Sequence, residues 1–554
     1  MATILNRRDF IAGGAIAGAT ALLATATGCA PKAPEASTAS LAATGATSAD
    51  AGKRSWEIAP EPITDIAEVR DFDVIVIGAG IAGINAAQAA ASDGATVAVI
   101  EQSDQWTAHG SDIGAIGSSY QKAEGIEIDA PKIVNELVQY GHSWVSGNLI
   151  NIWARRSGEM MDEVIAIGNE AGVETTASKG EETRTEVEAY YKQYPTSHSF
   201  GTGSITDDVW PTGQILRPIV KKAEAQGAEF VYNTHAEQLV QETDGTVTGV
   251  VVTAEDGSFV QYNAAKAVVL ATGDIGGNEE MLEAWCPRFL RTMPTMYNPI
   301  EGNMGDGLKM GLWAGGKTQE GPAAMMVHAA GPNSPLQPTT IGWMQFNAHG
   351  KRFYNETPSN VATTNAMVAQ PLHKSWYLFD GDFRDKVLAM IPENEDNFGP
   401  LVGEDIDSVL DKAIEGGFLF RGESLEDLAA QLDVPADTLK ASVERYNELC
   451  SKGVDEDFSK DPRWLEHTSV EKAPFYAGVV PFGAFVCIFG LSVNDECQVL
   501  REDGTAIPGL YAIGNVQGDF FASDYPLLCP GLSHGRAMTF GRLVGHSVAQ
   551  GKQI

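Results

Sequence analysis

A glycine-rich turn between a predicted strand and a predicted helix constrains the fold of this chain more than any other segment. The stretch FDVIVI (residues 72–77) is mostly apolar, and Gly78-x-Gly80-x-x-Gly83 follows it directly. An alanine-rich helix and a second apolar strand ending at Glu101 come next. The first two glycines allow a tight turn and the close approach of a pyrophosphate, and the third lets the helix pack closely on the strand.

This strand–helix–strand unit predicts a dinucleotide-binding α/β domain. Glu101 lies 23 residues after Gly78, where an acidic side chain can hydrogen bond to the hydroxyls of a ribose. The motif serves either NAD or FAD, and two later strand ends, at Ala271 and at Asn515, favour FAD because flavin sites of this type are completed by a late strand. The chain has no second G-x-G-x-x-G of comparable quality, so we predict no NAD(P)H site.

The loop that follows the second strand adds further candidates for contact with the flavin. Its sequence, HGSDIGAIGSSY, supplies small residues and backbone amides, and it either borders the cofactor or is an ordinary surface loop. The residues of all these segments that we predict to bind FAD are Gly78, Gly80, Ile81, Ala82, Gly83, Glu101, Gln102, Gly110, Ser111, Gly117, Ala271, Thr272, Gly273, Gly514 and Asn515.

The first 70 residues are predicted to lie outside this fold. Residues 1–29 contain Arg7-Arg8 followed by an Ala/Gly-rich apolar stretch, which is typical of a twin-arginine export signal. The segment around Cys29 loosely resembles a lipoprotein cleavage box, so either lipid anchoring at Cys29 or plain cleavage nearby fits it. Residues 30–70 are rich in Ala, Ser, Thr and Pro and predict a flexible linker. We therefore expect a protein of the cell envelope, on its extracytoplasmic face.

The net charge and the cysteines exclude several functions. A formal charge of −35 repels phosphate backbones, so nucleic acid is not expected as a partner. Five cysteines follow Cys29, an odd number with no C-x-x-C pair, so neither a disulfide framework nor any metal site is predicted. Their spacing does not support an iron–sulfur cluster, although four of the five thiols could meet in space. They are Cys286, Cys450, Cys487, Cys497 and Cys529.

The order of motifs along the chain resembles the FAD-dependent fumarate reductase/3-ketosteroid dehydrogenase superfamily. The matching segments include GAGIAG, ATGDIGGN, GNMGDGLKMGLWAGG, NAHGKRFYNE, IPGLYAIGN and AMTFGRLVG. The resemblance implies an α/β fold in which a Rossmann-like, glutathione-reductase-like FAD domain (71–333 and 479–554) is interrupted by an α+β capping domain (334–478). It also implies that backbone amides at Gly531, Leu532 and Ser533 contact the flavin.

Local signals within the predicted capping domain indicate two helix starts. Ser424 and Asp427 form a capping-box pattern at the start of one helix. Pro435 lies at the start of the next, where the missing N–H of proline costs nothing.

Three positions depart from the fumarate-reducing members of this superfamily. In those members an arginine four residues after the acid of the GKRF-x-NE motif delivers a proton, and here Asn360 stands four residues after Glu356. A clamp histidine is replaced by Phe485 or Val486, and no arginine precedes Arg536 in the closing loop. Because a buried dicarboxylate without cations costs several kcal/mol per charge, these changes predict a neutral, apolar or bulky substrate. The resemblance implies that this substrate is one such as a cardiac glycoside.

The resemblance implies a reductase of an activated carbon–carbon double bond in an α,β-unsaturated lactone or carbonyl. Reduced FAD would give a hydride from N5, and Tyr525, in a turn similar to that of the ketosteroid branch, would supply the proton. The alternative is a core aromatic residue whose hydroxyl caps a turn. His328 and Asn360 are further catalytic candidates, although an isolated histidine is as often structural. Electrons would come from a membrane-associated c-type cytochrome.

Three competing functions fit the same residues. The first is a 3-ketosteroid Δ1-dehydrogenase working in the oxidative direction, and the second is a reductase of another enoate such as urocanate, cinnamate or a fumarate-like acid. The third is a flavin electron-transfer protein without a substrate of its own.

Overall fold

The computed structural model describes residues 52–176, 193–202, 209–294, 302–329, 342–357, 360–390, 406–479 and 482–554. The predicted export signal, Cys29 and most of the predicted linker lie outside the described residues. The chain divides at Pro60 into two units, and the described part of the first contains one short 3₁₀ turn, η1 (Ser55–Glu57). All further elements belong to the second unit, Glu61–Ile554.

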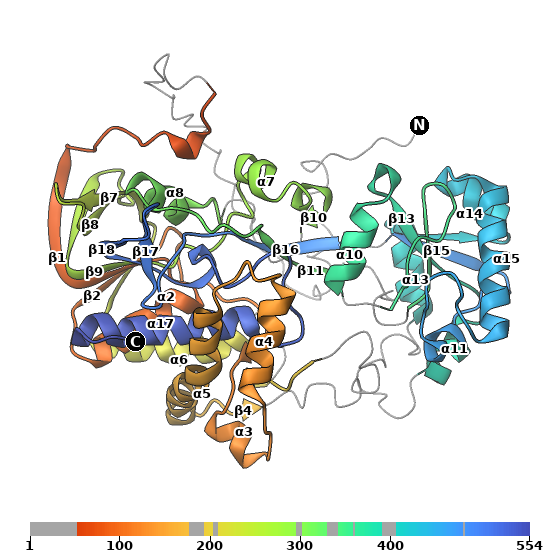
Figure 1. Cartoon of the computed structure of the whole chain (residues 1–554), viewed down its shortest axis with the longest axis horizontal. Coiled ribbons are helices and arrows are strands. Elements are labelled where there is room, and N and C mark those ends of the chain that lie inside the picture. The colour runs from red at the N-terminus through yellow and green to blue at the C-terminus, as the bar shows by residue number, and fades with distance from the viewer. Residues whose placement is uncertain are drawn as a thin grey trace, which may run out of the picture. The chain divides into compact units, whose positions relative to one another are not determined.

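The largest sheet has eight strands and contains the predicted dinucleotide-binding core (Figure 1). Its main path runs β17-β18-β9-β1-β2-β6, in which β1, β2, β6, β9 and β18 are parallel neighbours. The hairpin strands β7 and β8 join it antiparallel to β9, and Asp256-Gly257 forms the turn between β8 and β9. The strands are β1 (Ile66–Ile77), β2 (Val97–Ile100), β6 (Glu229–Val231), β7 (His235–Gln241), β8 (Val247–Thr253), β9 (Phe259–Leu270), β17 (Gln498–Leu500) and β18 (Ala506–Ala512).

Helices α2 (Ile81–Ser92) and α17 (Leu532–Gln550) lie side by side against this sheet (Figure 1). They approach closely because α17 presents glycines: a Cβ added at Gly541 would lie 2.5 Å from the carbonyl oxygen of Ala82. The other helices of this region are α3 (Ser119–Ala123), α4 (Ala130–Tyr140), α5 (Gly147–Glu170), α6 (Pro211–Ala225), α7 (Glu279–Trp285) and α8 (Asp306–Trp313), with the turns η3 (Phe289–Arg291) and η5 (Gly514–Val516).

Two three-stranded sheets stand beside the main one. The order β3-β5-β4 joins β3 (Ile113–Gly114), β4 (Thr175–Thr176) and β5 (Ser197–Phe200). The order β10-β16-β11 joins β10 (Met293–Pro294), β11 (Ala324–Ala329) and β16 (Phe482–Ile488). The second of these sheets carries two of the segments singled out by the sequence, around His328 and Phe485.

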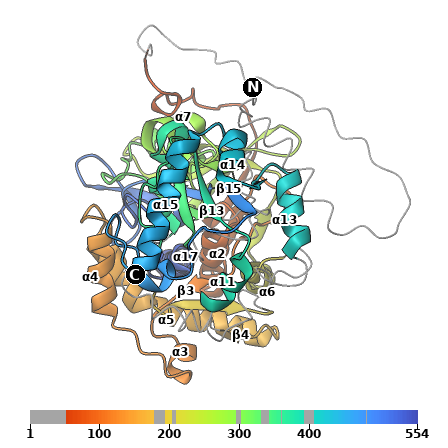
Figure 2. The ribbon, with the colours of Figure 1, turned by 90° about the vertical axis from the view of Figure 1, so that its right-hand side faces the viewer.

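A separate antiparallel sheet of four strands, β12-β13-β15-β14, falls within the predicted capping domain. Helices α14 and α15 pack on it and close a core that contains Phe346, Trp376 and Leu439 (Figure 2). The predicted helix starts are confirmed: the Ser424 side chain accepts a hydrogen bond from the Asp427 amide, and α15 begins directly after Pro435.

The elements of this region are β12 (Met344–Asn347), α10 (Asn360–Val368), η4 (Pro371–His373), β13 (Ser375–Phe379), α11 (Phe383–Met390), α13 (Ile406–Glu415), β14 (Leu419–Gly422), α14 (Leu425–Leu432), α15 (Ala436–Lys452), α16 (Pro462–Leu465) and β15 (Phe475–Val479). The boundaries 334 and 478 of the capping domain stay a prediction.

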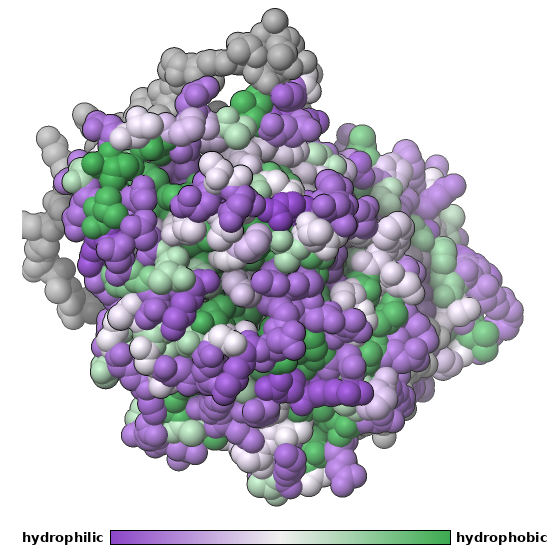
Figure 3. Space-filling view, turned by 60° about the vertical axis from the view of Figure 1, so that its left-hand side comes forward, coloured by the Kyte–Doolittle hydropathy of each residue, from purple (hydrophilic) through white to green (hydrophobic). Residues whose placement is uncertain are grey.

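The face drawn in Figure 3 is covered mainly by hydrophilic residues, with hydrophobic residues in small scattered groups. This agrees with the strongly acidic composition of the chain. Among the helices that the structure describes, none combines the length and the apolar character needed to cross a membrane.

Candidate functional site

The glycine turn after β1 has the packing that its sequence predicts. Gly78 adopts φ +106°, and a Cβ there would lie 2.5 Å from the carbonyl oxygen of Ala271. A Cβ on Gly83 would collide with the carbonyl oxygen of Gly78, so the third glycine brings α2 onto the turn. A Cβ at Gly80 would meet no atom within 4 Å among the described residues. The turn is therefore packed against the protein on one side and open at Gly80, at the start of α2.

The open side of this turn suits a pyrophosphate. The first amides of a helix have no partner within the helix, and α2 begins at Ile81 without a side-chain cap. Glu101 is buried beside it: Oε2 accepts a hydrogen bond from the Ala79 amide (2.7 Å) and Oε1 from the Ser103 amide (2.8 Å). The carboxylate thus supports the turn and keeps acceptor capacity for a ribose hydroxyl. Gln102, next to it, is exposed.

The loop predicted from Gly110 to Gly117 lies against the start of α17. The Gly114 amide donates to the carbonyl oxygen of Gly531 (2.8 Å), and a Cβ on Gly535 would collide with Gly114. The Ser111 carbonyl accepts from the Ser199 hydroxyl, and Gly117 is exposed with open space around its Cα. The structure therefore brings together two groups of predicted flavin-binding residues that lie about 400 positions apart, and the surface-loop alternative does not describe this contact.

Two further predicted FAD contacts lie at strand ends next to these helices. Gly514 follows β18, and a Cβ there would lie 2.9 Å from Ala82 of α2. Thr272, after β9, has a buried hydroxyl oxygen without a hydrogen-bond partner among the described residues, and this oxygen lies against Gly307 of α8. The starts of α2 and α17, with Glu101 beside the first of them, offer donors and acceptors that fit FAD.

Asn515 and Ser533 meet through a hydrogen bond and share a buried cation. The Ser533 hydroxyl donates to Asn515 Oδ1 (3.2 Å), and Arg536 Nη2 donates to the same oxygen (2.6 Å). Arg536 is completely buried, its Nη1 donates to the Gln517 carbonyl (3.2 Å), and its guanidinium stacks on Phe521. Burial lowers the pKa of Arg536 to about 9, so the side chain is still charged at neutral pH.

Tyr525 lies at the start of α17. Its side chain is buried, and its hydroxyl oxygen accepts a hydrogen bond from the Ser533 amide (2.9 Å), one of the amides left unpaired at the helix start. A phenol that accepts this bond still has a proton to donate. Burial raises the pKa of Tyr525, which keeps the phenol protonated. The hydroxyl of Tyr525 therefore caps the start of α17, as the alternative interpretation of this residue expects. Its role as a proton donor stays a proposal.

The other two catalytic candidates lie on neighbouring elements. His328 belongs to β11, opposite Gly483 of β16, and Asn360 is the first residue of α10, which packs against β11. Their side chains lie outside the described residues, so only these backbone positions are established. Phe485 occupies a bulge of β16, between the paired residues Val486 and Ala484.

One guanidinium contacts all three segments that carry the predicted catalytic residues. Arg288 Nη1 donates to Asn365 Oδ1 of α10 (3.1 Å), and Nη2 donates to the carbonyl oxygen of Ala323 (3.3 Å), just before β11. Nη2 also donates to the Ser523 carbonyl and lies 2.9 Å from Asp524 Oδ1, next to Tyr525. The second oxygen of Asp524 accepts from the Asn365 amide group (2.7 Å).

The sequence analysis did not identify Arg288, because it searched for arginines only at the positions that the superfamily uses. The hydrogen-bond partners of Arg288 lie 35, 77 and 235 residues away along the chain. No spacing of neighbouring residues indicates such a site. Only knowledge of which distant segments of the chain pair with one another would have identified Arg288.

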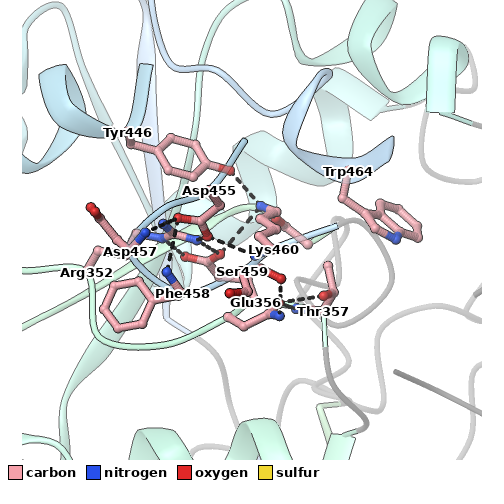
Figure 4. A network of polar contacts seen from close by, with 12 residues as sticks. Arg352, Glu356, Thr357, Tyr446, Asp455, Asp457, Phe458, Ser459, Lys460 and Trp464 are labelled. Atoms are coloured by element: carbon pink, nitrogen blue, oxygen red, sulfur yellow. Dashed lines mark hydrogen bonds and ion pairs between the residues drawn. The ribbon is translucent and has the colours of Figure 1, made fainter. Parts of the chain in front are cut away.

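The motif GKRFYNE forms a buried charge network in the capping region (Figure 4). Arg352 donates to both oxygens of Glu356 (2.7 and 2.8 Å) and to both oxygens of Asp455 (2.9 and 2.7 Å). Lys460 donates to the Tyr446 hydroxyl (2.6 Å) and lies 3.5 Å from Glu356 Oε2. Two cations therefore face two carboxylates, and this network holds the segment that leads into α10.

The cysteines are mostly buried, as expected for small apolar residues. Cys286, Cys487, Cys497 and Cys529 are buried, and Cys450 is half-buried. Among the described residues, no group of three or more His, Cys, Asp or Glu side chains is placed to hold a metal ion.

Comparison with known proteins gives one family and several full-length relatives. The family model described as FAD binding domain matches residues 73–527. Vinyl phenol reductase of Lactiplantibacillus plantarum is 28% identical over 516 residues, covering 88% of this chain and 98% of that protein. Urocanate reductase of Eggerthella lenta is 26% identical over 513 residues, covering 89% and 76%.

A solved structure shares the fold. The 3-ketosteroid-Δ4-(5α)-dehydrogenase of Rhodococcus jostii RHA1, in complex with 4-androstene-3,17-dione, superposes with a TM-score of 0.67 at 22% identity. The match covers 89% of this chain and all of that one. The likeness shows that the two chains share their fold.

Proposed function

The chain belongs to the FAD binding domain family, and on that premise we propose that it reduces an activated carbon–carbon double bond in an uncharged substrate. FAD-dependent oxidoreduction follows from the family and from relatives that are reductases. The observation that carries the finer proposal is the contact of Arg288 with all three segments that bear Tyr525, His328 and Asn360. A substrate held there would lie next to the predicted flavin contacts at Gly531–Ser533.

The residues that would hold FAD are the amides at the start of α2, Glu101 and the glycine-packed contact between Gly114 and Gly531. When bound and reduced, FAD supplies a hydride.

Tyr525 is the group that we propose to protonate the substrate carbon or to hydrogen bond its carbonyl oxygen. The Ser533 amide fixes the hydroxyl by donating to it, so the phenol proton points away from the helix start. The raised pKa favours the protonated phenol at neutral pH, as a general acid requires. His328 and Asn360 stay secondary candidates at this site.

An uncharged substrate is supported by what stands where fumarate-reducing members place cations. Phe485 and Asn360 carry no charge, and Arg288, the cation beside Tyr525, is already paired with Asp524. Vinyl phenol, in the name of the full-length relative, is an uncharged acceptor and a convenient first probe, and unsaturated lactones such as cardiac glycosides belong to the same class.

Export by the twin-arginine route, a lipid anchor or cleavage near Cys29, and electron supply by a c-type cytochrome complete the proposal. They rest on the sequence of residues 1–29 and on the missing second dinucleotide motif. Enoate reduction and steroid dehydrogenation are the competing activities. Because one relative is a urocanate reductase, urocanate is included among the acceptors tested.

Anaerobic reoxidation of the dithionite-reduced holoprotein tests the proposal. The acceptors are 4-vinylphenol, an unsaturated steroid lactone, a 3-ketosteroid, urocanate and fumarate, each followed by the return of oxidised flavin absorbance. We expect fast reoxidation by an uncharged acceptor and slow reoxidation by the two acids. If only the acids reoxidise the flavin, the substrate class is wrong, and if no acceptor does, the protein is an electron-transfer flavoprotein.

A further inference from the structure

The pair Arg288–Asp524 has the composition of a carboxylate-binding site that the chain fills with its own acid. Arginine binds carboxylates through paired N–H donors, and such charge-assisted bonds are the strong ones. Here Arg288 supplies the cation, and Asn365 supplies an amide N–H to the other oxygen of the same carboxylate. A substrate carboxylate at this place would find the same donors, with Asp524 removed.

The position of the pair allows it to act on a substrate. Asp524 directly precedes Tyr525, and Asn365 lies on α10, five residues after Asn360. The side chains of Arg288 and Asp524 are 28% and 21% exposed, so neither is sealed in a core. This differs from the network around Arg352, in which both acids are completely buried.

We propose that Asp524 determines substrate charge: its carboxylate occupies Arg288 and Asn365, and thereby excludes substrates that carry a carboxylate of their own. This inference rests on the proposed function and names the residue that sets its substrate class. The cation Arg288 is thus present at the site, but Asp524 already pairs with it. In an enoate reductase such a cation would be available to the carboxylate of the substrate.

Electrostatics gives the exclusion two components. An anionic substrate would be repelled by Asp524 at close range, and it could not pair with Arg288 without displacing Asp524. Burial raises the pKa of Asp524, while Arg288 and Asn365 lower it. The net rise means that the fold disfavours the charged form of this carboxylate. Removal of the acid would leave Arg288 partly desolvated without its counterion, a position that a substrate carboxylate can take.

The test compares two probes that differ by one carboxylate, 4-vinylphenol and 4-hydroxycinnamate, on the holoprotein. The variant is Asp524→Asn, and the matched control is Asp519→Asn, a half-buried acid of the same loop whose side chain bonds to Ser492 and the Val493 amide instead. We expect Asp524→Asn to raise the ratio of kcat/KM for the acid over that for the phenol at least tenfold. Asp519→Asn should leave the ratio unchanged, and Asp524→Asn with Arg288→Met should restore the wild-type ratio.

A second variant keeps the proposal testable where Asp524→Asn does not fold. Asn365→Ala retains both charges and removes one donor to Asp524, so we expect a change of the ratio in the same direction, by about threefold. An unchanged ratio in both Asp524→Asn and Asn365→Ala overturns the proposal.

Binding separates this inference from the proposed function. The saturated acid 3-(4-hydroxyphenyl)propionate is titrated into the oxidised holoprotein, with the flavin absorbance as the signal. We expect Asp524→Asn to bind it at least tenfold more tightly than wild type, and equal affinities contradict the inference. If wild type reduces none of the acceptors in the panel, the proposed reductase function fails while this binding result still decides the role of Asp524.

Discussion

Two buried arginines, one in the capping region and one beside the flavin site, differ in what surrounds their charge. Arg352 pairs with two carboxylates, each through two hydrogen bonds, and this pairing raises its pKa despite burial. Arg536 contacts the neutral oxygens of Asn515 and Gln517 and an aromatic face, and burial lowers its pKa.

The difference indicates what each cation stabilises. Buried charges are tolerated when they are paired, and the two cations and two acids around Arg352 balance one another inside the protein. The partners of Arg536 are uncharged, so its field acts on whatever lies near Asn515 and Ser533. In the proposed holoprotein that neighbour is the flavin, which gains negative charge on reduction. We therefore expect the charges around Arg352 to stabilise the fold, and the charge of Arg536 to act on the bound flavin.

Removal of Arg352 should give the largest effect on stability. In Arg352→Met, Glu356 and Asp455 lose their shared cation while they remain buried, and breaking such a pair costs about 3–5 kcal/mol. The measurement is urea unfolding at pH 7. Arg445→Met is the control, because Arg445 forms comparable ion pairs at an exposed position, where solvent screens them and they stabilise the fold little. Equal losses in the two variants would contradict the structural role of the buried network.

Substitution of Tyr525 separates its two roles on the flavin side. In Tyr525→Phe we expect turnover to fall about a hundredfold, the usual size of a lost general acid, with FAD still bound. The Ser533 amide also loses its acceptor, so the unfolding free energy should fall by about 1–3 kcal/mol. Tyr140→Phe is the control, since that hydroxyl donates to the Tyr525 carbonyl. Unchanged turnover in Tyr525→Phe, measured by stopped-flow flavin reoxidation, would leave only the capping role.

Removal of Arg536 should be milder than removal of Arg352. Arg536→Met leaves the Gln517 carbonyl oxygen without the donor that Arg536 supplies and takes one of two donors from Asn515 Oδ1. It orphans no charge, so we expect a loss of about 1–2 kcal/mol. The flavin reduction potential should also become more negative, because a nearby positive charge favours the reduced cofactor. Spectroelectrochemical titration measures this shift. A larger loss of stability in Arg536→Met than in Arg352→Met would contradict the conclusion that Arg352 is the arginine that stabilises the fold.

The pH dependence of the capping network should be the smallest effect. Burial lowers the pKa of Lys460 from 10.5 to about 8, opposed by Glu356. Between about pH 8 and pH 10.5 the unfolded chain therefore binds more protons at this residue than the folded chain, and stability rises with pH. Between pH 7 and pH 9 the gain is about 1 kcal/mol, and it should be absent in Lys460→Met. Urea midpoints at the two pH values test this, and an equal slope in wild type and variant would exclude Lys460 as its source.

Several features of the fold followed from local sequence. The strand–glycine–helix unit at Gly78–Gly83, the hairpin turn at Asp256-Gly257 and the cap at Ser424 each depend on residues that are near neighbours in the chain. Turn geometry, helix capping and close helix–strand packing act over a few residues, so spacing alone identifies them.

Only part of the candidate site could be predicted from the sequence. Motifs predicted Tyr525 and the flavin contacts, whereas Arg288 was missed because Asn365 and Asp524 reach it from other elements. The Arg352 network was missed for a related reason: Glu356 is four residues away, but Asp455 is 103 residues away. The sequence shows where an arginine stands, but it does not show which distant acid pairs with it.

The sequence by itself determined that this chain builds a dinucleotide-binding α/β domain, because glycine positions between apolar strands and a helix encode that unit, and the order of later motifs indicated FAD. Only the tertiary structure decided which charges are neutralised and which are left to act. Pairing of charges depends on distances of about 3 Å between side chains from distant segments, and these distances exist only after the chain has folded.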